Sequence, residues 1–405
     1  MKVRRVCLPV AGFRAAGIHA GIKEAAMDLA LIAAEEPVPT AAVFTQSTVV
    51  GAPVEISRAR VGQNRIRGVV VNSGISNVAM GRRGLRDARK MSALAASALG
   101  CGEEEMLVAS TGVIGEPLPM DVMQQGIPRV AAALSSDGFQ DAAEAIRTTD
   151  THAKVASVRL RLGTVGGAKS EPITITGMAK GSGMIEPNMA TMLSFLVTDA
   201  RVSPALLQRM LRRVSDATYN RLSIDGEGST SDSVVLMANG RAGKTALRAG
   251  SPEAKQFEKA LFAVCEDLVR QLARDGEGAT RLITVEVSGA RSAAEADRAA
   301  RRIGNSLLVK TAIFGGDPNW GRIIQTIGAG GIAWNAEKAR VRIGGVAVFS
   351  RGRSTGPVAR KRAEKAMREE EILIQVDLAR GRASARLLTC DLSYDYVKIN
   401  AEYTT

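Results

Sequence analysis

Histidine is scarce in this sequence, and the spacings that would build a metal site or a catalytic triad are missing. Only His19 and His152 occur among the 405 residues. No HxxxH or HExxH spacing is present, and no GxSxG turn marks the nucleophile of a Ser-His-Asp hydrolase. We therefore expect neither a histidine-based metal site nor a histidine-dependent triad.

Cysteine is almost as rare, and long apolar runs are missing. The four cysteines lie far apart and form no CxxC pair, which excludes a disulfide framework and a zinc ribbon and is typical of a reducing cytoplasm. No uninterrupted apolar run reaches the roughly 18–20 residues that a membrane span needs. Because Arg14 interrupts the apolar stretch at the start, no signal peptide is expected. These features predict a soluble, cytoplasmic protein without membrane association.

Aromatic residues make up only 3% of the chain, although its formal net charge is +13. The arginines are scattered, and few aromatic side chains are available to stack on bases. Nucleic acid is therefore not an expected partner. A basic surface suits the attraction of small anionic substrates, and it serves solubility equally well.

The length predicts two domains, because a single core rarely grows beyond about 250–300 residues. Strand-like and helix-like segments alternate, which indicates the α/β class. We place the boundary between a larger domain, 1–285, and a smaller α/β domain, 286–405.

Several short sequence patterns predict where individual helices begin or end and where a hairpin turns. Residues 84–99 form a helical pattern closed by Gly100, and Ser203–Pro204 marks the start of another helix. Gly344–Gly345 predicts a two-residue hairpin turn. Ser292 with Glu295 forms a capping box.

The segment from Lys180 to Leu196, KGSGMIEPNMATMLSFL, carries the clearest chemical signal. A loop with glycines and a proline leads to Thr191, and an apolar run, Met192 to Val197, follows at once. A threonine in this place can attack the carbonyl of Ala190, shift the acyl group to oxygen and become a new chain start. Its free α-amine, with a reference pKa of roughly 7.7–8.0, then serves as the base for its own hydroxyl. An ordinary strand start would explain the same window.

Three further segments could contribute to such a site. Ser110–Thr111–Gly112 follows a short apolar strand, and a turn there could direct backbone N–H groups into an oxyanion hole. Glu277 lies just past a helix, where its carboxylate could hold a substrate ammonium group or simply be solvated. The C-terminal string CDLSYDYVKINAEYTT is strand-like to its last residue, which suggests that the chain end is packed or belongs to the site.

Taken together, these strings resemble the glutamate N-acetyltransferase family, also called ornithine acetyltransferases. The resemblance covers nearly the whole chain in one consistent order. It is carried by GIHAGIKEAAMDLALI (17–32), AAVFT (41–45), STGVIGEPLP (110–119), TTDT (148–151), KGSGMIEPNMATMLSF (180–195), RDGEGATR (274–281), GDPNWGRI (316–323) and the terminal DLSYDYVKINAEYTT.

The resemblance implies the fold and the site. It implies a layered α/β/β/α core with a smaller α/β C-terminal domain, and self-cleavage between Ala190 and Thr191 into chains 1–190 and 191–405. Thr191 would be the nucleophile, and Thr111 and Gly112 would form the oxyanion hole. The implied substrate-binding residues are Thr151, Lys180, Thr191, Glu277, Asn400 and Thr405.

The implied reaction moves the acetyl group of N2-acetyl-L-ornithine to L-glutamate by a ping-pong mechanism, as a step of arginine biosynthesis. Neither a cofactor nor a metal is implied, and the cleaved chains would stay together as an α2β2 assembly. The sequence departs from the family at NSGISN (72–77), DGEGSTSDS (225–233) and Glu186. These departures leave open the acceptor range and whether acetyl-CoA is a second donor. The rival hypotheses are an N-terminal-nucleophile amidohydrolase or aminopeptidase and a basic, non-catalytic binding protein.

Overall fold

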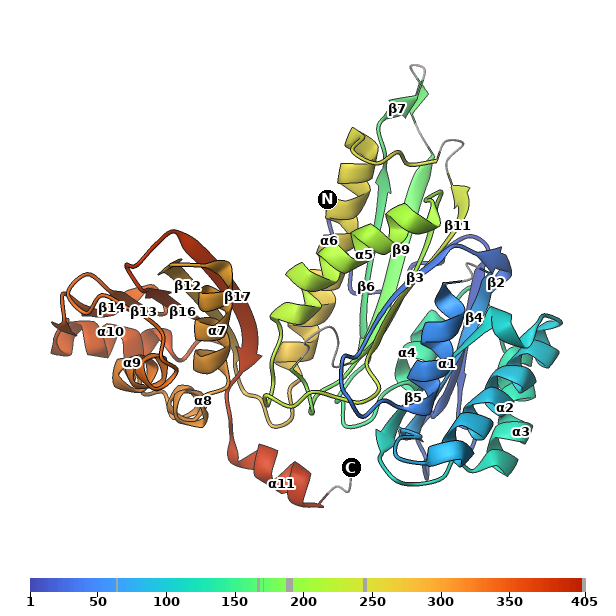
Figure 1. Cartoon of the computed structure of the whole chain (residues 1–405), viewed down its shortest axis with the longest axis horizontal. Coiled ribbons are helices and arrows are strands. Elements are labelled where there is room, and N and C mark those ends of the chain that lie inside the picture. Colours follow the sequence, from blue (N-terminus) through green and yellow to red (C-terminus); the bar gives the residue numbers. More distant parts are fainter. Residues whose placement is uncertain (63–64, 166–167, 170, 187–191, 243–245, 403–405) are drawn as a thin grey trace.

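The chain forms a larger part with two stacked sheets and a smaller part around a third sheet (Figure 1). The computed structural model describes residues 1–62, 65–165, 168–169, 171–186, 192–242 and 246–402. Helices cover the sheets in both parts, so the predicted α/β class is confirmed.

The first sheet has four strands in the order β1-β2-β4-β5. Its strands are β1 (Phe13–Ile18), β2 (Leu29–Val38), β4 (Ile66–Ile75) and β5 (Met106–Val113). The β4 and β5 pair is parallel, because α2 (Gly81–Leu99) returns the chain between them. Gly100 ends α2 in the left-handed conformation, as predicted. Helices α1 (Ala52–Val61), α2 and α3 (Met120–Ala132) share an apolar core with one face of this sheet.

The second sheet has five strands in the order β3-β11-β10-β9-β6. Its strands are β3 (Thr40–Phe44), β6 (Lys154–Arg161), β9 (Pro172–Lys180), β10 (Leu193–Ala200) and β11 (Ser233–Ala242). The central strand β10 is buried along its whole length, which confirms the predicted buried strand after Thr191. Helices α5 (Pro204–Ala217) and α6 (Pro252–Arg274) pack on the face that lies toward the smaller part (Figure 1). The short strands β7 (Thr164–Val165) and β8 (Ala168–Lys169) form a separate hairpin.

The two sheets face each other across an apolar core, and helices cover their outer faces. Phe13, Val71, Phe195 and Met237, which come from both sheets, are all buried in this core. Helix α4 (Phe139–Ala145) lies against β1 at the side of the same core. Together these layers form the expected α/β/β/α arrangement.

The smaller part is built on a six-stranded sheet in the order β15-β14-β13-β16-β12-β17. Its strands are β12 (Leu282–Ala290), β13 (Arg340–Ile343), β14 (Val346–Ser350), β15 (Arg353–Ser354), β16 (Glu371–Asp377) and β17 (Ala383–Cys390). Its helices are α7 (Ala293–Gly304), α8 (Leu307–Phe314), α9 (Trp320–Ala329) and α10 (Pro357–Ala366). Because β12 belongs to this sheet, the boundary that we place at 285/286 falls inside a strand.

Most of the local signals are confirmed. The Ser203–Pro204 start matches α5, and the Ser292 hydroxyl accepts a hydrogen bond from the Glu295 N–H at 3.2 Å. Gly344 and Gly345 join β13 to β14 with φ values of 55° and 76°, as a two-residue hairpin requires.

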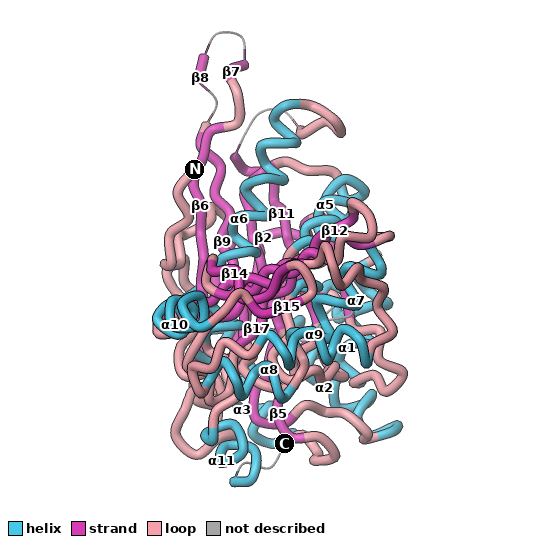
Figure 2. Tube along the Cα trace, turned by 90° about the vertical axis from the view of Figure 1, so that its left-hand side faces the viewer, coloured by secondary structure: helices cyan, strands magenta, loops and turns pink. Residues whose placement is uncertain are grey.

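Two local predictions are wrong. Residues 110–112 do not form a turn, because β5 continues through them to Val113 in register with β4. The C-terminal tail is not strand-like: residues 394–402 form helix α11 (Tyr394–Glu402). Edge strand β17 ends at Cys390, and the described residues after it join no sheet. Figures 1 and 2 show α11 leaving the smaller part and extending beneath the sheets toward the lower end of β5.

Candidate active site

A pocket opens where β5 and β9 end and where β10 and β11 begin. Residues on both sides of the Ala190–Thr191 peptide bond line it. The described lining residues are Ser76, Thr111, Gly112, Ile114, Thr148, Thr149, Lys180, Gly181, Gly183, Met184, Met192, Leu193, Ser229, Thr230, Ser231, Asp232, Glu277 and Asn400. The described charged side chains of the pocket are therefore those of Lys180, Asp232 and Glu277.

Thr111 and Gly112 lie near the end of β5, where the strand borders the pocket. Gly112 has a φ of 127°, and an added Cβ would meet the carbonyl carbon of Gly74 at 2.2 Å. Only glycine therefore fits this close approach of β5 to β4. A backbone held this tightly is suited to fixed N–H donors, which is what stabilisation of an oxyanion requires.

Lys180 ends β9 and points to the β5 side of the pocket. Its ammonium donates to the hydroxyl of Thr148 at 2.7 Å and to that of Thr111 at 3.2 Å. Burial lowers the pKa of Lys180, and the negative charge of Asp150 offsets part of this effect. Lys180 is thus a buried cation beside the predicted oxyanion position, with a charge suited to a substrate carboxylate.

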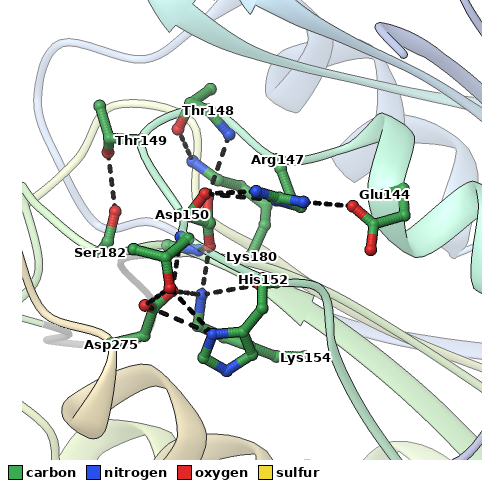
Figure 3. A network of polar contacts seen from close by, with 12 residues as sticks. Glu144, Arg147, Thr148, Thr149, Asp150, His152, Lys154, Lys180, Ser182 and Asp275 are labelled. Atoms are coloured by element: carbon green, nitrogen blue, oxygen red, sulfur yellow. Dashed lines mark hydrogen bonds and ion pairs between the residues drawn. The ribbon is translucent and has the colours of Figure 1, made fainter. Parts of the chain in front are cut away.

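A buried network of ion pairs and hydrogen bonds lies next to Lys180 (Figure 3). The Lys154 ammonium donates to Asp150 at 2.6 Å and to Asp275 at 2.5 Å, and its side chain has no exposed surface. Asp150 also accepts from the Gly181 N–H at 2.6 Å. Burial raises the pKa of Asp150, but the charges of Lys154 and Lys180 and the hydrogen bonds outweigh it and hold the pKa well below its usual range.

The same network fixes Thr151. Its N–H donates to Asp275 at 3.0 Å, and its hydroxyl donates to the other oxygen of the same carboxylate at 2.5 Å. Lys154 therefore joins the segment that carries Thr151 to Asp275, which lies two residues before Glu277. This ammonium group thus links the chain segments on the two sides of the predicted cleavage point, in addition to the pairing of β9 with β10.

Glu277 and Asn400 close another side of the pocket. The Glu277 carboxylate accepts from the Asn400 amide at 2.7 Å, so α11 contributes to the site through its last turn. Glu277 is 7% exposed, and its N–H donates to the carbonyl of Ser182 at 2.7 Å. An added Cβ on Gly183 would lie 2.4 Å from a Glu277 carboxylate oxygen, so a larger residue at this position would displace the Glu277 carboxylate.

The loop that leads toward residue 187 is held by two sets of contacts. The N–H groups of Met184 and Ile185 donate to Asp225 at 2.6 Å and 2.8 Å. The Glu186 carboxylate accepts from Arg301 at 3.0 Å and from Asn305 at 2.8 Å, near the end of α7. The loop is therefore fixed to the smaller part five residues before the predicted nucleophile.

The structure brings five of the predicted site residues together in one pocket: Thr111, Gly112, Lys180, Glu277 and Asn400. Thr151 does not line this pocket, and it is linked to the site through Asp275.

Three other predictions concern Ala190, Thr191 and Thr405, which lie outside the described residues.

Sequence reasoning missed several polar residues of the site. Thr148 and Asp150 stand in the TTDT string, beside the predicted Thr151, and Asp232 stands in the string DGEGSTSDS. TTDT carried the resemblance without a role for each residue, and DGEGSTSDS stood out only as a departure from the family pattern. Nothing in the sequence indicated that Lys154 belongs to the site, because a lysine near the start of a strand is usually solvated.

Comparison with known proteins identifies the family to which the chain belongs. The model of the ArgJ family matches residues 14–405. The chain belongs to the ArgJ family. The arginine biosynthesis bifunctional protein ArgJ of Geobacter sulfurreducens is 46% identical over 397 residues, which cover 98% of this chain and 100% of that protein. The ArgJ protein of Bacillus subtilis is 42% identical over 395 residues, covering 97% and 95%. The predicted family is therefore confirmed over nearly the full length.

Two solved structures are also similar to this ArgJ family member. The crystal structure of ArgJ from Bacillus halodurans is 44% identical, with a TM-score of 0.49, and covers 52% of this chain and 98% of that chain. The ornithine acetyltransferase of Mycobacterium tuberculosis, complexed with ornithine, is 36% identical, with a TM-score of 0.41, and covers 47% and 100%.

The described residues hold neither a metal-binding cluster nor a membrane-spanning helix. In this part of the chain, no group of three or more His, Cys, Asp and Glu side chains is placed to hold a metal ion. Among the described helices, none has both the length and the apolar character of a membrane span.

Proposed function

We propose that this ArgJ family member transfers the acetyl group of N2-acetyl-L-ornithine to L-glutamate through an acetyl ester on Thr191. The observation that carries the proposal is the full-length similarity to arginine biosynthesis bifunctional proteins, at 46% identity over 98% of the chain. The convergence of Lys180, Glu277, Thr111 and Gly112 on one pocket supports it.

The pocket chemistry suits an N-acetylated amino acid. Buried Lys180 offers a cation to the α-carboxylate that ornithine and glutamate share. Glu277, held by Asn400, offers a carboxylate to the side-chain ammonium of ornithine. We assign Thr111 and Gly112 to the oxyanion that develops when the Thr191 hydroxyl attacks the acetyl carbonyl. One amide replaces another, so the exchange needs no nucleotide energy and no cofactor.

We also propose that Thr191 becomes a chain terminus by self-cleavage after Ala190. On one side of the proposed cleavage point, Met184 and Glu186 are held by Asp225, Arg301 and Asn305, and on the other side β10 pairs with β9. The Asp150–Lys154–Asp275 bridge would then hold the two products together. The assembly that we propose is α2β2, in the cytoplasm.

One experiment tests the transfer and the nucleophile together. Purified protein is incubated with N2-acetyl-L-ornithine alone, and intact-mass and fragment spectra are recorded. We expect a chain that begins at Thr191 and carries one acetyl group on that residue. An uncut, active 405-residue chain would overturn the proposal.

A second measurement defines the acceptor and the donor. With L-glutamate present, N-acetyl-L-glutamate should form with little acetate, whereas acetate as the main product would identify an amidohydrolase. Acetyl-CoA, the second candidate donor, is tested by replacing acetyl-ornithine in the same assay.

A further inference from the structure

Asp232 is a buried carboxyl group of the pocket to which the proposed reaction gives no role. It is 2% exposed and lines the pocket together with Thr111, Gly112 and Lys180. It directly precedes β11, whose first residue, Ser233, pairs with Leu193 and donates from its N–H to the carbonyl of Met192 at 3.0 Å. Asp232 therefore lies beside the start of β10, close in sequence to the proposed nucleophile.

One oxygen of this carboxyl group has no partner in the described structure. Its Oδ2 atom is buried and forms no hydrogen bond with any described residue. Buried carboxyl oxygens in proteins are normally hydrogen-bonded, and each exception calls for an explanation. In a pocket of this kind, a polar group of the substrate would be a natural partner.

The surroundings of Asp232 favour its protonated form. Burial raises the pKa of Asp232 well above its ordinary value, and hydrogen bonding to Ser229 and the charge of Lys180 offset only part of this. Among the described residues, the other charged groups that face the pocket are Lys180 and Glu277. A neutral carboxylic acid can donate a proton, whereas the carboxylate can take one up.

The proposed transfer needs such a group because its two half-reactions have opposite proton demands. When Thr191 takes the acetyl group, its hydroxyl proton passes to the departing nitrogen, and ornithine leaves as an ammonium ion only after gaining one more proton. When glutamate enters, its ammonium must lose one proton before the free amine can attack the acetyl ester. One proton is thus consumed first and released later.

We propose that Asp232 stores this proton between the two half-reactions. The inference rests on the proposed function, because it presumes that an acetyl group is carried on the enzyme. In the first half-reaction the Asp232 carboxylic acid protonates the departing α-amine and becomes a carboxylate. In the second, the carboxylate takes one proton from the entering α-ammonium and becomes the acid again. The cycle then closes without net exchange of protons with solvent.

The first test is infrared difference spectroscopy of the complete wild-type enzyme mixed with N2-acetyl-L-ornithine. The carbonyl band of a protonated carboxylic acid should disappear as the band of the acetyl ester grows, and it should return when L-glutamate is added. The same band in Asp232→Glu should shift, which assigns it. An acetyl ester that forms with no change in the acid band would overturn the inference.

The second test measures each half-reaction against pH in Asp232→Asn. In the wild type, acetylation should slow as pH rises through the pKa of Asp232, because the proton donor is lost. Deacylation by glutamate should speed up over the same range. We expect Asp232→Asn to lose the pH dependence of both half-reactions and to slow acetyl transfer by about 10²–10⁴-fold. Asp232→Glu should recover the pH dependence.

Asp199→Asn is the matched control. Asp199 lies near the other end of β10, outside the pocket lining, and it is buried with a raised pKa that has the same cause, burial. Its substitution should leave the pH dependence of both half-reactions and the infrared changes as in the wild type. Should wild-type enzyme form no acetyl ester at all, the proposed function itself would fail, and the two failures are thereby distinguished.

Discussion

Replacing Lys154 by methionine removes the one ammonium group that joins Asp150 to Asp275. The Lys154 and Asp150 side chains have no exposed surface, and that of Asp275 is 4% exposed, so solvent does not screen the charges. Removal of one partner from a buried pair typically costs about 3–5 kcal/mol, because the remaining charge is left uncompensated. Here two carboxylates would remain, so we expect the local loss to lie at the upper end of that range.

Hydrogen exchange measures this loss where it should occur. The N–H groups of Gly181 and Thr151 donate to the two carboxylates at 2.6 Å and 3.0 Å. Exchange through local opening at these amides should become roughly 100-fold to several thousand-fold faster in Lys154→Met. Mass spectrometry of peptides that cover the two amides gives the measurement.

Two comparison variants make the prediction specific. Arg213 pairs with Glu258 at 2.6 Å, but their side chains are 57% and 25% exposed, so Arg213→Met should cost no more than about 1 kcal/mol. Asp275→Asn keeps one buried pair intact and should cost less than Lys154→Met. Exchange at Gly181 that changes less than about tenfold in Lys154→Met would refute the assignment of this network as the bridge.

Three other predictions can be checked separately. Gly112→Ala should lower acetyl transfer by about 10²–10³-fold in a steady-state assay, because the new Cβ would meet Gly74 at 2.2 Å, whereas Gly62→Ala, with nothing within 4 Å, should leave it unchanged. Thr191→Ala should give a single uncut band on a denaturing gel and no acetyl-enzyme; two bands would contradict self-cleavage. The depressed pKa of Asp150 stabilises the fold above the ordinary aspartate pKa of about 3.9, and this contribution is lost as pH falls further, so the gap in free energy of unfolding between wild type and Asp150→Asn should shrink below about pH 4.

Much of the local structure could be predicted from the sequence because it depends on near neighbours. The left-handed end of α2 at Gly100, the Ser292 cap of α7 and the Gly344–Gly345 turn each involve residues a few positions apart. Their hydrogen bonds and dihedral preferences are encoded in the segment itself. The order of the motifs along the chain was enough to predict the family.

Predictions from local sequence patterns were wrong where a tertiary contact decided the conformation. Residues 110–112 have the composition of a turn, yet pairing with β4 extends β5 through them. The tail has a strand-like composition, yet its described residues after β17 leave the sheet and form α11. Hydrogen bonds to a neighbouring strand determine where a strand ends, so the length of a strand cannot be predicted from its own residues alone.

The amino-acid sequence by itself determined the α/β class, the family and the residue types available for acyl transfer. Only the tertiary structure decided which of them meet. Lys180 reaches Thr111 across 69 positions, Asn400 reaches Glu277 across 123, and Lys154 reaches Asp275 across 121. Periodicity indicates that a face is buried, but it does not indicate against which other segment. The buried charges and the unpaired oxygen of Asp232 follow from that packing, which is why they emerge only in the folded chain.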